Sequence, residues 1–170
     1  MYIEREKFNK YPYFQKIDEI KLKREEVQGK KKMSVETKEL HLNTRGEVEI
    51  IDITGNVNRA LSESKINDGI VTIFVPGSTG AVTTIEYEPG LLKDLPNALE
   101  RLFPKGIAYE HEYRWHDGNG HSHVRAALLG PSLTVPFKDK KLMVGTWQQV
   151  VFIELDNKRR ARRIILQILG

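Results

Sequence analysis

From residue 34 onward, apolar and polar residues alternate mostly with a period of two, which is typical of half-buried β-strands. The pattern predicts strands over residues 35–43, 47–53, 70–75, 81–86, 132–137, 141–145, 147–155 and 160–169. Helical spacing predicts a short helix carrying Val57 and Leu61, a helix over residues 90–103 and another over residues 122–129. Pro96 predicts a kink in the second helix, or its division into two. We therefore expect one α+β domain, rich in antiparallel strands, with two or three helices.

The composition suits a soluble globular domain and excludes several kinds of chemistry. Of the 170 residues, 39% are hydrophobic and 29% are charged, and none is cysteine. Disulfide bonds, thiolate zinc sites and thiol catalysis are therefore excluded. No apolar run approaches the roughly 20 residues that cross a bilayer, and the first residues do not resemble a signal peptide. We expect a cytoplasmic protein without a membrane partner.

The formal charge of +4 is confined to the start of the chain. Residues 1–32 hold 10 Lys and Arg against 6 Asp and Glu, whereas the remaining 138 residues hold 17 of each kind. This distribution predicts a basic N-terminal extension, residues 1–32, before a single domain over residues 33–170. A basic face on the domain is not expected, so the pattern disfavours nucleic acid as a partner.

The most informative segment lies between Tyr109 and Trp147, because four of the five histidines occur there within thirteen residues. They are His111, His116, His121 and His123, and they accompany Asp117 and Asn119. Imidazole ligates metals and transfers protons near neutral pH, so the crowding indicates a site. If His121 and His123 lie on a strand, they share one face; on a helix they diverge by about 200°. The alternative is a set of polar loop residues satisfied by hydrogen bonds.

Three further segments could belong to a binding site, and each also has a purely structural interpretation. The turn at residues 76–80 offers the hydroxyl groups of Ser78 and Thr79 to a phosphate, or is simply a tight bend between strands. Trp147 could stack on a heteroaromatic ring whose edge Gln148 recognises, or be a core tryptophan. Arg160 and Arg162 alternate on the last strand. They could grip a phosphate in bidentate fashion, or protect a sheet edge from aggregation.

Several separated stretches together resemble the YjbQ family. They are Phe74-Val-Pro-Gly-Ser-Thr-Gly-Ala-Val-Thr-Thr-Ile-Glu86, Tyr109-Glu-His111, Asp117-Gly-Asn-Gly-His-Ser-His123, residues 128–136, Leu142-Met-Val-Gly-Thr-Trp-Gln148, and Glu154-Leu-Asp with Arg160-Ala-Arg162. The resemblance covers residues 34–170 in the right order. It implies a compact pseudobarrel or sandwich that assembles as a homotrimer, with a polar, metal-binding pocket near the subunit boundaries.

The resemblance also implies an activity, that of a secondary thiamine-phosphate synthase, which joins a pyrimidine diphosphate to a thiazole phosphate. Its catalytic residues would be Glu86, His111 and His123, which together with His121 would hold a divalent metal ion, zinc or magnesium. Asn119 or Asp117 would orient a histidine ring. One position departs from the family pattern: many relatives have histidine where this chain has Gly77. His121 could take its place in space.

Two function classes follow from these observations. The first is a metal-assisted enzyme acting on small phosphorylated heterocycles, in which the metal neutralises a pyrophosphate leaving group. The second is a non-catalytic trimeric protein that binds a metal or a small anion. A trimer also has a physical motive, because the strands at residues 70–75 and 150–155 are apolar on both faces while few helices are predicted to cover them.

Overall fold

The computed structural model describes residues 33–170, which form one compact unit. The elements are β1 (Val35–Asn43), β2 (Glu49–Asp52), α2 (Thr54–Ser62), β3 (Gly69–Phe74), β4 (Gly80–Ile85), α3 (Leu91–Leu102), α4 (Glu112–Trp115), α5 (Gly120–Leu129), β5 (Ser132–Lys138), β6 (Lys141–Leu142), β7 (Gln149–Glu154) and β8 (Ala161–Leu169). The predicted α+β class is confirmed, although this part of the chain has four helices rather than two or three. The predicted basic extension, residues 1–32, lies outside the described residues.

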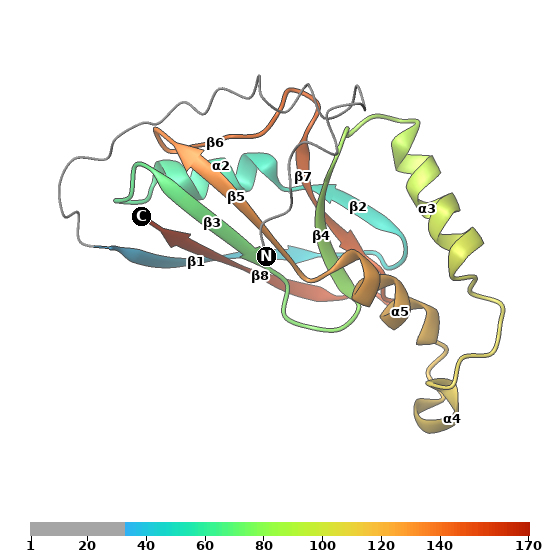
Figure 1. Cartoon of the computed structure of the whole chain (residues 1–170). Coiled ribbons are helices and arrows are strands. Elements are labelled where there is room, and N and C mark those ends of the chain that lie inside the picture. Colours follow the sequence, from blue (N-terminus) through green and yellow to red (C-terminus); the bar gives the residue numbers. More distant parts are fainter. Residues whose placement is uncertain (1–32) are drawn as a thin grey trace, which may run out of the picture. The chain divides into compact units, whose positions relative to one another are not determined.

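The strands form two antiparallel sheets (Figure 1). One has the order β1-β8-β3-β5-β6, and the other has the order β2-β7-β4. In the smaller sheet Gly80 pairs with Glu154 at one end, and Ile85 pairs with Gln149 at the other. A strand advances about 3.3 Å per residue, so these two ends lie roughly 17 Å apart. This separation decides which predicted site residues can meet.

Strand β7 lies between two apolar cores, and each of its faces packs into one of them. Val150 and Phe152 join the larger core, which α2 shares with the five-stranded sheet. Val151 and Ile153 join a second core with Leu99 of α3 and, from α5, Ala126. The order of layers is therefore five-stranded sheet with α2, three-stranded sheet, and then α3 with α5. Strand β7 is covered on both faces within one chain, so the predicted need for a neighbouring subunit to cover it was wrong.

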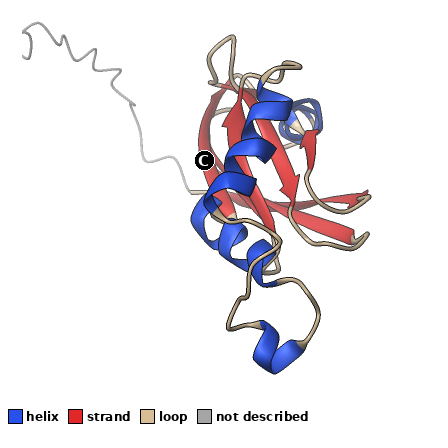
Figure 2. Ribbon diagram, turned by 90° about the vertical axis from the view of Figure 1, so that its right-hand side faces the viewer, coloured by secondary structure: helices blue, strands red, loops and turns tan. Residues whose placement is uncertain are grey.

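The helices differ from the predictions at three points that matter for the site. Helix α3 runs unbroken through Pro96, so it does not divide into two pieces. Helix α5 begins at Gly120, two residues before the predicted start. The one-turn helix α4 was not predicted, and Figure 2 shows it on a loop that projects away from the sheets. No helix of the described residues is both long and apolar enough to span a membrane.

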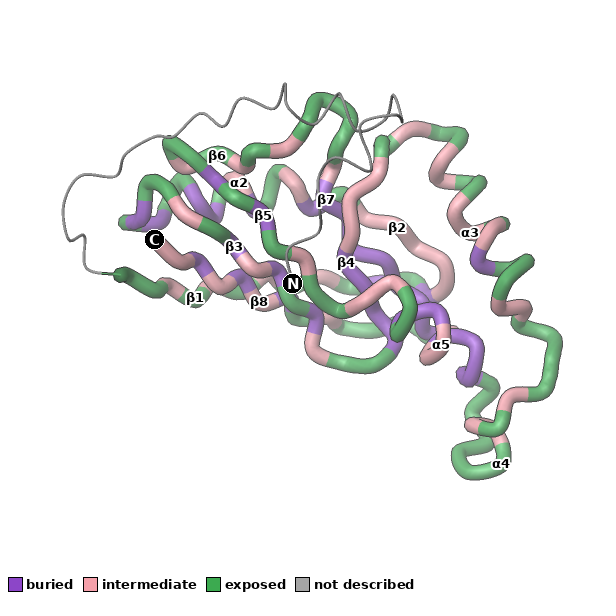
Figure 3. Tube along the Cα trace, viewed as in Figure 1, coloured by how far each residue is buried: buried purple, intermediate pink, exposed green. Residues whose placement is uncertain are grey.

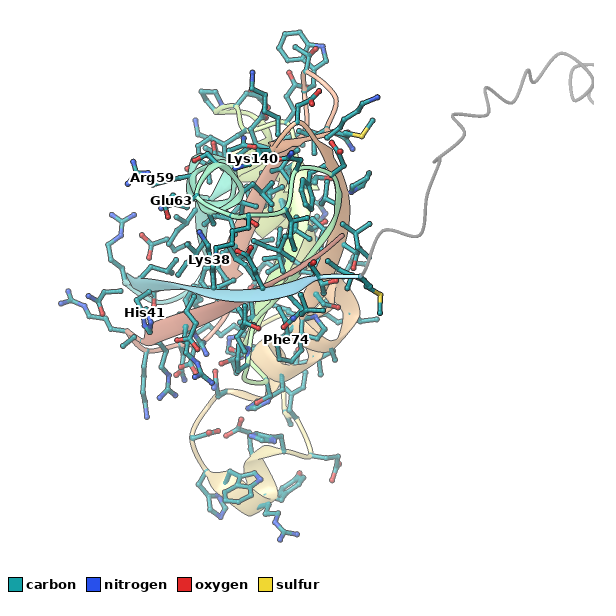
Figure 4. The ribbon with its side chains drawn as sticks, turned by 90° about the vertical axis from the view of Figure 1, so that its left-hand side faces the viewer. Lys38, His41, Arg59, Glu63, Phe74 and Lys140 are labelled. Carbon is teal, nitrogen blue, oxygen red and sulfur yellow. The ribbon has the colours of Figure 1, made fainter. Side chains whose placement is uncertain are left out.

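The outer face of the five-stranded sheet carries no helix of the described part. Figure 4 shows Lys38 on the side of the sheet that faces α2, whereas His41 and Phe74 point from the opposite side. Ile70 and Phe74 on this outer face are 39% and 40% exposed. Within residues 33–170, this face is thus partly apolar and has no covering helix.

Candidate functional site

The histidine-rich segment is held against the end of the smaller sheet where Gly80 pairs with Glu154. The backbone N–H groups of Gly118 and Gly120 donate to the carboxylate of Glu112, at 2.6 and 2.9 Å. Asn157, in the turn after β7, donates its side-chain amide to the carbonyl oxygens of Asp117 and Gly118. Hydrogen bonds therefore attach this loop both to α4 and to the turn between β7 and β8.

His111, Asp117 and His123 converge in this loop. Each offers one ligand atom, and the three atoms all lie within 4.8 Å of one another. The two imidazole rings have centroids 4.3 Å apart, and Nε2 of His111 is 3.6 Å from a carboxylate oxygen of Asp117. Nε2 of His111 is buried and has no hydrogen-bond partner. Buried polar atoms normally have hydrogen-bond partners, so the protein groups alone do not explain the burial of this nitrogen.

The environment of His123 disfavours the protonated form of its imidazole. Burial lowers the pKa of His123 below its ordinary value of 6.5, and the neighbouring His111 lowers it further, against the opposing charges of Asp117, Asp156 and Glu112. A neutral imidazole has a lone pair for a metal ion, whereas the protonated ring has none. The pKa shift and the convergence of ligand atoms therefore favour the same function, cation binding.

A small pocket lies beside His123. It has a volume of about 330 Å³, and its lining comes from the turn before β4 and from α5: Gly77, Ser78, Gly80, His123, Ala126, Ala127 and Pro131. Most of these side chains are small, so the pocket is open enough for a ligand group. Gly77, at the position where the family resemblance predicted histidine, has a positive φ of 122°, and a Cβ there would lie 3.3 Å from Nη1 of Arg162. A side chain at residue 77 would reduce this space.

Much of α5 next to the cluster is buried (Figure 3), and behind it two buried carboxylates meet two arginines. Glu154 and Asp156 are 0% and 2% exposed. Arg162 donates to the two carboxylate oxygens of Glu154 at 2.5 and 2.7 Å, and to Oγ1 of Thr79 at 2.8 Å. Arg160 lies 2.8 Å from the carboxylate of Asp156. Burial alone would raise the pKa of Asp156, but hydrogen bonds from Arg160, the backbone of Lys158, and Thr79 hold it below its usual value.

This network changes the roles predicted for several residues. Arg160 and Arg162 do point toward the same region, as predicted. Both pair with carboxylates there, however, so they are not available to bind a phosphate. The hydroxyl of Thr79 is likewise occupied, because it donates to Asp156 at 3.0 Å. Asn119 is buried and donates to Asp156 at 3.4 Å rather than to a histidine. Among these predicted substrate contacts, the exposed Ser78 alone keeps its place in the pocket.

The prediction that His121 shares a metal with His123 was wrong for this arrangement. Because both residues lie in α5, their side chains diverge, as the helical alternative requires. His121 is 1% exposed, and its Nε2 lies 2.9 Å from the carboxylate of Glu47. The expectation that His121 takes the place of a histidine at residue 77 was therefore also wrong.

Glu86, Trp147 and Gln148 lie at the opposite end of the smaller sheet. Glu86 follows the last residue of β4 and is exposed, roughly 20 Å along the strand from Gly80. Trp147 is 70% exposed, and Gln148 accepts a hydrogen bond from the backbone of Gly145. The expectation that Glu86 faces His111 and His123 within one chain was therefore wrong. The strand pairing, which the sequence does not specify, separates them.

Two features of the site were missed. Asp117 was expected to orient a histidine, but its carboxylate takes the position in the cluster that was assigned to Glu86. Trp115 was not among the predicted site residues, yet its ring centroid lies 6.5 Å from that of His111. The guanidinium carbon of Arg114 lies 5.6 Å from the Trp115 ring centroid. The spacing of His111 and Asp117 around a one-turn helix was the available signal, but that helix was not predicted.

Comparison with known proteins identifies the family. The family model described as UPF0047 protein YjbQ-like matches residues 38–170. The chain belongs to this family. It is similar to the UPF0047 protein of Archaeoglobus fulgidus, with 44% identity over 131 residues that cover 77% of this chain and 99% of that protein. It is also similar to the UPF0047 protein of Methanothermobacter thermautotrophicus, with 43% identity, 81% of this chain and 94% of that protein.

Solved structures support the same relationship. The fold is similar to that of a YbjQ-like protein of unknown function from Sulfolobus solfataricus, with a TM-score of 0.77, 34% identity, and coverage of 82% of this chain and 99% of that one. A YjbQ/UPF0047 family protein from Clostridium acetobutylicum gives a TM-score of 0.70 at 34% identity, covering 76% of this chain and 98% of that one. The predicted family and its β-rich fold are therefore confirmed.

Proposed function

We propose that this protein binds a divalent metal ion through His111, Asp117 and His123. The observation that carries the proposal is the convergence of three ligand atoms within 4.8 Å, in a cluster where Nε2 of His111 is buried without a hydrogen-bond partner. Two imidazoles and one carboxylate suit zinc, which accepts nitrogen and oxygen ligands, better than magnesium, which prefers oxygen. Three protein ligands also match zinc sites that keep a fourth position for water or substrate.

The surrounding charges support a cation rather than a free anion. Four carboxylates, those of Glu112, Asp117, Glu154 and Asp156, lie in or beside the cluster, against the two guanidinium groups of Arg160 and Arg162. An anion entering the pocket would therefore meet a net negative environment. We therefore expect a phosphate group to bind there more readily once a cation is present.

We propose further that the site is catalytic and acts on a small phosphorylated heterocycle, as a thiamine-phosphate synthase would. When bound, a divalent ion supplies Lewis-acid stabilisation for a phosphate or pyrophosphate leaving group. The chain itself contributes the pocket beside His123 and the hydroxyl of Ser78. The exposed ring of Trp115, close to His111, can pack against a heteroaromatic ring.

The alternative is a binding protein without catalysis, and the structure offers one specific reason for it. The predicted general base, Glu86, lies at the far end of β4, and the nearer acids Glu154 and Asp156 are engaged by arginines. Asp117 is assigned to the metal ion, and Glu112 accepts backbone hydrogen bonds. Within the described site, a histidine of the cluster would therefore have to act as the base. Metal binding without turnover would favour this alternative.

The experiment separates metal binding from catalysis. Zinc binding to the metal-free protein is measured by calorimetry, for the natural chain and for a His111→Ala/His123→Ala double variant. The matched control is a His41→Ala/His116→Ala double variant, because both of those histidines are exposed outside the cluster. We expect one zinc per chain, lost only in the first variant. Zinc retained by that variant would refute the site.

Turnover is then tested with the zinc-loaded protein. Incubation with hydroxymethylpyrimidine diphosphate and thiazole phosphate should give thiamine phosphate and pyrophosphate, and the double variant of the cluster should not. Zinc binding with no product from the natural chain would reject this activity and leave the binding protein. The two results are independent, so each part of the proposal can fail alone.

We also propose that the chain forms a homotrimer through the outer face of the five-stranded sheet. Ile70 and Phe74 on that face and Val35 at its edge are exposed apolar residues, and no helix of the described residues covers them. Sheets tend to bury such surface against a neighbour. Sedimentation at micromolar concentration should give a trimer, and Phe74→Glu should give smaller species. A monomeric natural chain would contradict the assembly.

A further inference from the structure

A second hollow, distinct from the one beside His123, lies where β1 ends and β8 begins. Its volume is about 580 Å³, and its lining consists of Asn43, Thr44, Arg45, Arg159, Arg160 and Ala161. Three of these six residues are arginine, and none is acidic. The hollow is within the size range of small-molecule sites.

The three arginines are not equally neutralised. Nε of Arg45 lies 2.8 Å from Glu49, and Arg160 pairs with the buried Asp156. The side chain of Arg159 is exposed and has neither an ion pair nor a hydrogen bond within residues 33–170. The exposed side chain of its neighbour Lys158 is also unpaired within that range. Two of the four basic side chains in this region are thus balanced by acids, and two are not, so the region has a net positive charge.

We propose that this arginine pocket binds the phosphate or diphosphate group of a small metabolite. The planar guanidinium group presents paired donors that match phosphate oxygen atoms, and Arg45 and Arg159 both keep donors free for this purpose. The side-chain amide of Asn43, at the rim, adds an uncharged donor and acceptor. The site needs no metal ion and does not depend on the proposed function.

The arginine pocket differs from the phosphate site that the alternation of Arg160 and Arg162 predicted. Arg162 turns inward to Glu154, so it does not line this pocket. Its place is taken by Arg45, which follows β1, and Arg159, which precedes β8. Such a pair becomes visible only once β1 and β8 are paired, with Asn43 opposite Ala161.

A small ligand fits this surface better than a nucleic acid does. The positive region is interrupted on its borders by carboxylates, because Glu39 accompanies Arg163 and Glu49 accompanies Arg45. Beyond residue 32 the chain holds equal numbers of acidic and basic residues. A nucleic-acid surface would need a longer unbroken basic stripe to follow a phosphate backbone.

The test uses the full chain, freed of metal, and inorganic pyrophosphate as the probe. Binding is followed by calorimetry and by phosphorus NMR at low ionic strength, because screening weakens such contacts. We expect saturable binding of one pyrophosphate per chain. Arg159→Ala should weaken it about tenfold or more, because charge-assisted hydrogen bonds to the phosphate oxygens are lost. The side chain of Arg159 has no partner to lose among residues 33–170, so the variant should keep its fold.

Two controls make the result specific. Arg101→Ala removes another exposed arginine, from the last turn of α3, and should leave binding unchanged. The His111→Ala/His123→Ala variant should also bind pyrophosphate normally, which separates this site from the metal cluster. Equal affinity in Arg159→Ala and the natural chain would overturn the proposal. Tighter binding of a short single-stranded RNA, with the same dependence on Arg159, would overturn it in favour of a nucleic-acid surface.

Discussion

The two faces of α5 carry the same residue type for opposite purposes. On one face His123 belongs to an open cluster with His111 and Asp117, where a buried nitrogen lacks a partner. On the other face His121 lies in a network in which each charge is matched. The two histidines are separated by a single residue, so sequence proximity alone says nothing about shared function. The backbone conformation decides which of them is available for chemistry.

The network around His121 connects three separate parts of the chain. Glu47, before β2, contacts His121, Arg125 and Lys105. Arg125 is 1% exposed, lies 2.5 Å from Glu100 of α3, and donates to the carbonyl of Phe103. Burial would raise the pKa of Glu47, but hydrogen bonds from Lys105 and His121 hold it below its usual value. We infer that this face holds α3 and α5 together.

The largest expected effect follows from removing Arg125. Arg125→Met should lower the free energy of unfolding by about 3 kcal/mol or more, because it removes a buried cation that contacts the largely buried carboxylate of Glu47 and the carbonyl of Phe103. Chemical denaturation measures the change. Arg101→Met, at an exposed position of α3, should change it by less than about 0.5 kcal/mol. A loss equally small in both variants would show that the network does not stabilise the fold.

The functional difference between the two faces gives the next largest effect. His123→Ala should weaken zinc binding about a hundredfold, since even partners outside the ligand shell contribute 10–100-fold to zinc affinity. His121→Ala should leave zinc binding nearly unchanged but lower the free energy of unfolding by about 2 kcal/mol, because it leaves Glu47 with fewer donors. Calorimetry with zinc and denaturation of both variants measure the two quantities. Equal zinc losses would return His121 to the metal site.

The sequence predicted most strands, because alternation with a period of two depends only on local burial. It could not predict that Ile85, rather than Gly80, lies at the far end from the histidines, because that depends on the pairing of β4 with β7. Glu86 was therefore assigned to the wrong end. The contact of Arg125 with Glu47, 78 residues away, has no local signal at all.

For the site itself, the residue types were more predictable than their partners. The histidine crowding correctly indicated where ligand atoms gather, but the start of α5 decides which histidines share a face, and helix ends are poorly specified by pattern. The acids Glu154 and Asp156 and the arginines Arg160 and Arg162 are spaced to pair across a single turn. That complementarity was the signal that these arginines are neutralised within the protein.

A smaller effect is expected at Gly77, on the side of the pocket shared with His123. Its φ of 122° is unfavourable for residues with a Cβ, and a Cβ there would lie 3.3 Å from Arg162. Gly77→Ala should lower the free energy of unfolding by about 1–2 kcal/mol. Gly106→Ala is the matched control, because no atom lies within 4 Å of its Cβ position and its φ is not positive. Equal stability of the two variants would show that the turn adapts readily.

The smallest expected effect concerns the protonation of His123, since one full pKa unit corresponds to only about 1.4 kcal/mol. Above pH 6.5 the ring is neutral in both the folded and unfolded chain. As the pH falls below 6.5, the unfolded chain binds a proton first, because burial and His111 lower the pKa in the folded state. The contribution of His123 to the free energy of unfolding should therefore decrease between pH 6.5 and that lower pKa, and then level off.

NMR titration of the imidazole should show a pKa below 6.5. Asp117→Asn should lower it further because a favourable negative charge is lost, whereas His111→Ala should raise it. Opposite shifts in these two variants would confirm that the three groups share one electrostatic site, and no response to either would separate His123 from its neighbours.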